Sequence, residues 1–134
     1  MTDTLLEQLE RLIGSEDFEY ESTKIIEKLK AEEAGLETVE KLFRIIERHP
    51  LDDFGIPGET AYFIEDFYPA YLPALIHSIR RTPALNTVWM LNRCINGGQQ
   101  KEELLAALKA VAANDSIAPA IRESARSFLA YQAG

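Results

Sequence analysis

The stretch from Gly58 to Asn96 constrains the fold most, because its apolar residues recur at the three- and four-residue steps of a helix face. The first face consists of Tyr62, Phe63, Phe67, Tyr71, Leu75 and Ile79, and the second of Leu85, Val88, Trp89, Asn92 and Ile95. A proline fits the first turn of a helix, where its missing N–H is not needed. The pattern predicts one helix from about Pro69 to Arg81 and another from Pro83, behind a Thr82 cap. Burial in a core is the simpler interpretation of the aromatic residues, and a binding surface is the alternative.

Glycine, proline and capping residues bound the other helices. We expect them at about 2–13, 15–34, 36–48, 59–67, 99–113 and 118–132, with a loop at 51–58. No segment shows the period-two alternation between hairpin dipeptides that is typical of strands. The chain has the length of one ordinary domain, so the sequence predicts a single all-α domain of about eight helices over residues 1–134.

The segment LLAALKAVAANDSIAPAIRESARSFLA, residues 104–130, resembles a HEAT repeat. Asp115 stands in the turn and Arg122 in the second helix, as in that family. The resemblance implies a HEAT-like α-solenoid, in which these two side chains help to order neighbouring repeats. The preceding helix has Asn92 and Arg93 and does not reproduce the arrangement, so an irregular helical bundle is the alternative.

Charge is distributed unevenly along the chain, whose net charge is −8. Residues 1–66 contain 18 acidic and 7 basic side chains, a net charge of −11, whereas residues 67–134 contain 4 acidic and 7 basic side chains, a net charge of +3. An acidic chain is a poor ligand for phosphate backbones, so we expect no binding to nucleic acid. The polarity favours a basic protein partner, and solubility is the simpler alternative.

No constellation of residues indicates catalysis, a cofactor or a metal. His49, His77 and Cys94 are isolated in sequence, whereas a zinc site needs convergent ligands. The carboxylate pairs 52–53 and 65–66 are adjacent, and adjacent helical residues diverge, so solvated acids are the better interpretation. No glycine-rich phosphate loop or nucleophile elbow is present. We therefore expect a protein that is not an enzyme and uses no cofactor.

The cellular compartment is predicted from three features. The first residues are acidic where a secretory signal is basic, no apolar run is long enough for a membrane span, and one cysteine cannot form an internal disulfide. These features predict a cytoplasmic protein that does not enter a membrane. The sequence does not predict an oligomeric state.

Acidic and aromatic residues gather around the loop and the helix that follows it, as at many protein interfaces. The candidate partner-binding residues of this first strip are Asp52, Asp53, Glu59, Tyr62, Glu65 and Asp66. A later helix carries a candidate second strip of Asn92, Arg93 and Asn96, beside a Trp89 that is better explained as core.

The runs GETAYFIEDF and TVWMLNRCING, within residues 58–98, resemble small all-α immunity proteins of bacterial contact-dependent growth inhibition and other polymorphic toxin systems. The resemblance implies that the chain binds and neutralises a cognate toxin domain, such as a nuclease, with acids that mimic phosphate charge. A HEAT-like scaffold or regulatory subunit without inhibitory activity is the second hypothesis. A base-excision glycosylase on helical repeats is the third, and the net charge disfavours it.

Overall fold

The computed structural model describes residues 2–52 and 58–133 and is all-helical in those ranges. The eight helices of the described residues are α1 (Thr2–Leu12), α2 (Phe18–Ala31), α3 (Leu36–Arg48), α4 (Glu59–Glu65), α5 (Leu72–Arg81), α6 (Leu85–Gly97), α7 (Lys101–Ala113) and α8 (Pro119–Ala133). The all-α prediction is confirmed. Within the same ranges, no helix is both long and apolar enough to cross a bilayer.

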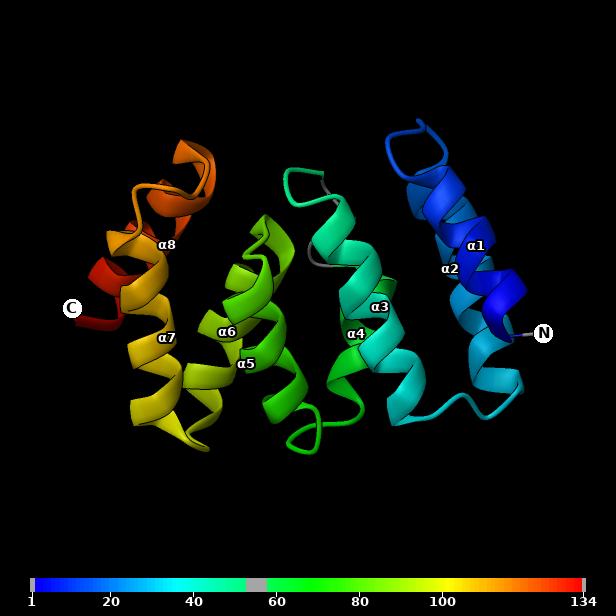
Figure 1. Cartoon of the computed structure of the whole chain (residues 1–134). Helices are drawn as coiled ribbons and strands as arrows, with labels where there is room; N and C mark the ends of the chain where they lie inside the picture. Colours follow the sequence, from blue (N-terminus) through cyan, green and yellow to red (C-terminus); the bar gives the residue numbers. More distant parts are fainter. Residues whose placement is uncertain (1, 53–57, 134) are drawn as a thin grey trace.

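The helices form two rows that follow the chain order (Figure 1). One row consists of α1, α3, α5 and α7, and each of these helices contacts the next. The other row lies behind it and contains α2, α4, α6 and α8, with contacts between α2 and α4 and between α6 and α8. Because the rows run from the N-terminal to the C-terminal pair, the acidic and basic halves of the sequence lie at opposite ends of the molecule.

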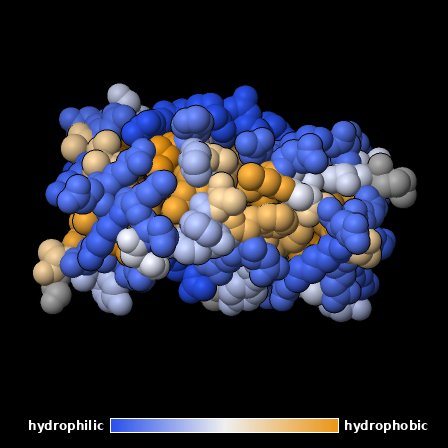
Figure 2. Space-filling view, turned by 90° about the horizontal axis from the view of Figure 1, so that it is seen from below, coloured by the Kyte–Doolittle hydropathy of each residue, from blue (hydrophilic) through white to orange (hydrophobic). Residues whose placement is uncertain are grey.

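Apolar side chains between the rows form the core. The largest fully buried residues come from both rows and include Leu9, Ile26, Phe43, Ile64, Tyr71 and Leu91. Tyr71 contacts Phe43 with a ring separation of 6.3 Å, which joins the middle helices. Seen from below in Figure 2, apolar side chains occupy the centre of the face and hydrophilic ones surround them. One continuous cluster of buried residues extends from α1 to α8.

Several predicted helix boundaries are wrong around the prolines. Helix α5 has Pro73, not Pro69, in its first turn, because the turn at 66–71 separates it from α4. Helix α6 begins at Leu85 behind Ala84 and not behind Thr82. The Thr87 hydroxyl accepts a hydrogen bond from the Ala84 N–H at 3.1 Å, so the capping side chain lies inside the helix.

The ends of two other helices also differ from the prediction. Helix α2 ends at Ala31, before Gly35, because Glu33 takes the left-handed conformation with φ of 55°. Leu36, the first residue of α3, is apolar but 37% exposed. Helix α7 begins at Lys101, two residues later than expected.

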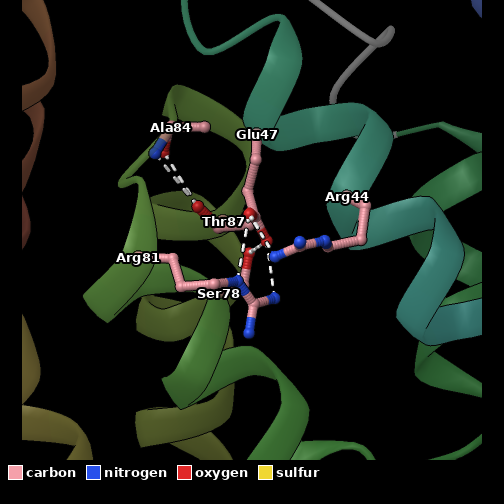
Figure 3. Close-up of polar contacts among 6 residues, drawn as sticks. All are labelled: Arg44, Glu47, Ser78, Arg81, Ala84 and Thr87. Carbon is pink, nitrogen blue, oxygen red and sulfur yellow. Dashed lines mark hydrogen bonds and ion pairs between the residues drawn. The ribbon is translucent and has the colours of Figure 1, made fainter.

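A polar cluster holds α3 against α5 (Figure 3). The Glu47 carboxylate accepts hydrogen bonds from Ser78 Oγ at 2.7 Å and from Arg81 Nη2 at 2.8 Å, and Arg44 lies 3.3 Å away. The Glu47 side chain is only 9% exposed. Burial acts to raise the pKa of Glu47, but the hydrogen bonds from Arg81 and Ser78 lower it by more than burial raises it. The net pKa is below the usual value, so the carboxyl remains ionised. This cluster fixes the spacing between α3 and α5.

Candidate binding surface

The first predicted strip is short and only partly exposed. In α4, Tyr62 is 41% exposed, whereas Phe63 and Ile64 beside it are buried in the core. Glu59 is partly exposed in the first turn, and Asp66 is exposed just after the helix. Apolar packing therefore holds α4 in place, and its remaining face presents one tyrosine and acidic side chains.

The two predicted strips meet through an ion pair. Arg93 of α6 donates a hydrogen bond from Nη2 to Glu65 Oε1 of α4 at 3.0 Å, and its Nε contacts the second oxygen. The guanidinium also lies over the Trp89 ring, 5.1 Å from its centroid, in a cation–π arrangement. The structure therefore brings together Glu65 and Arg93, which the sequence placed on separate strips. We name this region the α4–α6 surface and define it by Glu59, Tyr62, Glu65, Asp66, Arg93 and Asn96.

A hollow of about 440 Å³ lies in the α4–α6 surface. It is lined by Glu65, Tyr68, Tyr71, Arg93, Cys94, Asn96 and Gly97. The Tyr71 hydroxyl and the Cys94 sulfur are 3.0 Å apart at its base, and burial raises the pKa of both groups. The cysteine therefore remains a protonated thiol, which gives the hollow no thiolate nucleophile.

The aromatic residues divide between core and surface. Tyr71 is 1% exposed, so the core interpretation holds for it, whereas Tyr62 faces solvent. Trp89 is partly buried against the core, as favoured from the sequence. The Tyr68 hydroxyl is enclosed without a hydrogen-bond partner in the described part of the chain. It lies against Gly97, where an added Cβ would come within 2.5 Å of the Tyr68 oxygen.

Asn92 and Asn96 have a partner within the chain. Gln132 Nε2 of α8 donates hydrogen bonds to Asn92 Oδ1 at 2.8 Å and to Asn96 Oδ1 at 2.9 Å. An asparagine within a helix gains little without a partner, and Asn92 finds one inside the molecule. The amide N–H groups of both asparagines remain available for another protein. Sequence reasoning missed Gln132, because no local spacing connects residues 36 and 40 positions apart.

The predicted loop acid Asp52 lies apart from the Asn96 end of the α4–α6 surface. Asp52 is 3.3 Å from His49 Nδ1, and its backbone oxygen accepts a hydrogen bond from Asn86 at 2.9 Å. Asn86 is in the first turn of α6, whereas Asn96 is in its last, a separation of roughly 15 Å along the helix. Asp53 is outside the described residues.

The described residues contain no group of three or more His, Cys, Asp or Glu side chains placed to hold a metal ion. Comparisons with protein-family models, curated proteins and solved structures find no match to this chain. The geometry of the α4–α6 surface is therefore the basis for inferring a function. It offers exposed carboxylates, a stacked guanidinium and amide groups, which are groups that bind another protein.

Replacing Tyr68 by phenylalanine is expected to raise the free energy of unfolding by about 1 kcal/mol, because it removes a buried hydroxyl that has no partner. Replacing Tyr71 by phenylalanine is expected to lower it by about 1 kcal/mol, because the bond to Cys94 is lost. Urea unfolding followed by circular dichroism measures both. The same sign of change for the two variants would contradict the assignment of their hydroxyl groups.

Proposed function

We propose that the chain is an immunity protein, which binds a cognate toxin domain stoichiometrically and neutralises it. The observation that carries the proposal is the charge polarity along the helical rows: the half that contains α1–α4 has a net charge of −11. Such a surface attracts a basic protein, for example a nuclease whose active site is shaped for phosphates. The toxin would be met in the cytoplasm of the producing cell.

The free acidic side chains support this proposal. Most acids of the acidic half that form no ion pair within the described ranges are exposed: Glu16, Asp17, Glu19, Glu27, Glu32, Glu33, Glu37, Glu40 and Asp66. Glu59 is also unpaired and partly exposed. A basic partner would pair with these carboxylates, because the new ion pairs would offset the cost of removing water from them.

We also propose that the fold is a HEAT-like α-solenoid. The two rows of successive helices support it, as does the α7–α8 pair. There Arg122 donates a hydrogen bond to the Ile117 carbonyl at 3.0 Å and lies 3.3 Å from Asp115. This contact orders the turn between α7 and α8. Solenoids present an extended helical surface to protein partners, which suits stoichiometric inhibition.

The test begins with a pull-down of the tagged chain from its native strain, and mass spectrometry identifies the retained protein. Reversing both Glu59 and Asp66 to lysine is expected to weaken that complex about ten-fold at low salt, because two unpaired carboxylates are lost from the α4–α6 surface. The matched control reverses Glu102 and Glu103, which are exposed in the first turn of α7 and do not belong to the α4–α6 surface. Titration calorimetry at two salt concentrations measures the affinities.

Equal affinities for the two double variants would rule out the α4–α6 surface. A retained protein that is acidic, or whose toxicity continues in the complex, would rule out immunity. In the second case the complex would support the scaffold hypothesis instead. Glu65 is kept in this test because its loss would also break the internal ion pair with Arg93.

A further inference from the structure

A second hollow, of about 610 Å³, lies beside the connection from the end of α5 to the start of α6. Its lining residues come from α5, α7 and α8 and from Pro50 and Leu51 just after α3. Its base includes Ile79, Val111 and Ile121, which are 2–3% exposed. Leu51 rises at one side and is 55% exposed. We name this hollow the saddle groove.

Helix α7 gives the saddle groove a flat wall. Ala106 and Ala110 line it and are exposed, one helical turn apart on the same face. Small side chains allow another helix to approach closely, since the spacing of packed helix axes depends on the residues at the contact. The volume falls in the range of clefts that bind ligands, about 300–1,000 Å³. The groove therefore has the shape to receive the apolar face of a short helix.

The charge of the groove specifies the partner further. Its only charged lining residues in the described part of the chain are Arg80 and Arg81, although the chain contains more acidic than basic residues. Arg81 is occupied by two hydrogen bonds to Glu47, whereas Arg80 is exposed and forms no ion pair with any described residue. A guanidinium beside an apolar groove favours a carboxylate, which it can bind with two parallel hydrogen bonds.

We propose that the saddle groove binds an acidic amphipathic helix of a partner protein. The apolar face of that helix lies between α5 and α7, and one of its carboxylates pairs with Arg80. This interaction is independent of the proposed immunity function, because the groove shares no lining residue with the α4–α6 surface and prefers the opposite charge. The chain would then connect two partners, or two segments of one partner.

The test uses two fluorescein-labelled synthetic peptides of roughly four helical turns. They share the same leucine and alanine positions, and the polar positions are all glutamate in one and all lysine in the other. We expect the glutamate peptide to bind at least about ten-fold tighter by fluorescence anisotropy. This order opposes the net charge of the whole chain, and the variants below separate binding in the groove from attraction by the basic half.

Variants locate the binding. Ala110→Trp fills the groove and is expected to weaken the binding of the glutamate peptide at least about ten-fold. Ala113→Trp is the matched control, since Ala113 is exposed on the same helix and does not line the groove. Arg80→Glu changes one exposed side chain, and this variant is expected to bind the lysine peptide more tightly than the glutamate peptide. The α4 variant with Glu59 and Asp66 reversed is expected to bind the glutamate peptide like the wild type.

Three results would overturn the proposal: no binding of either peptide at millimolar concentration, tighter binding of the lysine peptide to the wild type, or equal effects of the two tryptophan variants. Light scattering is run on each protein, and a dimer that Ala110→Trp disrupts would assign the groove to a second copy of the chain instead. If circular dichroism shows that Ala110→Trp does not fold, the Arg80→Glu variant decides the test, and an unchanged preference for the glutamate peptide would overturn the proposal. Loss of the α4–α6 partner complex leaves these outcomes unchanged, so the two proposals fail separately.

Discussion

Glu47→Ala is expected to lower the free energy of unfolding by about 2–4 kcal/mol. The carboxylate is 9% exposed and binds Ser78 and Arg81 of α5. Its removal leaves the Ser78 hydroxyl, in a residue that is 0% exposed, without its acceptor. It also releases two arginines from the junction of α3 and α5. Urea unfolding at neutral pH, followed by circular dichroism, measures the loss.

Two further variants sharpen this measurement. Glu47→Gln keeps an oxygen for Ser78 but removes the charge, so we expect about half of the alanine effect. Glu40→Ala is the matched control, because Glu40 is exposed on the same helix and forms no ion pair with a described residue. If Glu47→Ala and this control lower the free energy of unfolding to within about 0.5 kcal/mol of each other, the cluster does not stabilise the packing of α3 against α5.

The second large effect is a loss of stability in acid that depends on Glu10. Arg48 donates hydrogen bonds to its carboxylate at 2.8 and 2.9 Å, and His49 Nε2 lies 2.9 Å away. The hydrogen bonds from Arg48 and His49 outweigh the opposing effect of burial and lower the pKa of Glu10 from 4.5 to about 2. A lowered pKa means that this carboxylate stabilises the fold fully above pH 4.5 and loses that contribution as the pH falls toward 2.

Glu10→Gln is therefore expected to be less stable than the wild type by about 2 kcal/mol at pH 7, a value reduced for solvent screening. The difference should shrink as the pH falls and vanish near the lowered pKa of Glu10. Urea midpoints measured across this range provide the test. Glu7→Gln, on the exposed face of the same helix, is expected to differ from the wild type by less than about 0.5 kcal/mol throughout. A Glu10→Gln difference that is independent of pH would contradict the assigned role of the carboxylate.

Local sequence signals predicted most of the helices. The apolar period and the His49–Pro50 stop gave the bounds of α3, and Gly14 and Gly98, both with φ of 87°, lie just beyond α1 and α6. The errors around Pro69 and Thr82 have a different cause. Several prolines there offer alternative helix starts, and packing of α4 and α5 on the core selects among them.

The candidate site was less predictable than the fold. Helical spacing placed Glu59 and Tyr62 together on α4, with Asp66 just after it, because these residues are neighbours on one short element. The contact between Glu65 and Arg93 joins residues 28 positions apart, and no periodicity within a helix indicates such a pair. The same holds for Gln132 and for the saddle groove, whose walls come from separate helices.

The bridge from Gln132 ties the last helix to the α4–α6 surface. Only Ile121 and Ala125 of α8 are buried, so detaching this helix exposes less apolar surface than detaching one from the middle of the rows. Detachment of α8 would break both amide contacts and leave the carbonyl groups of Asn92 and Asn96 without Gln132. A hydrogen-bond donor on a protein that docks at the α4–α6 surface would therefore compete with Gln132 for these two carbonyl groups.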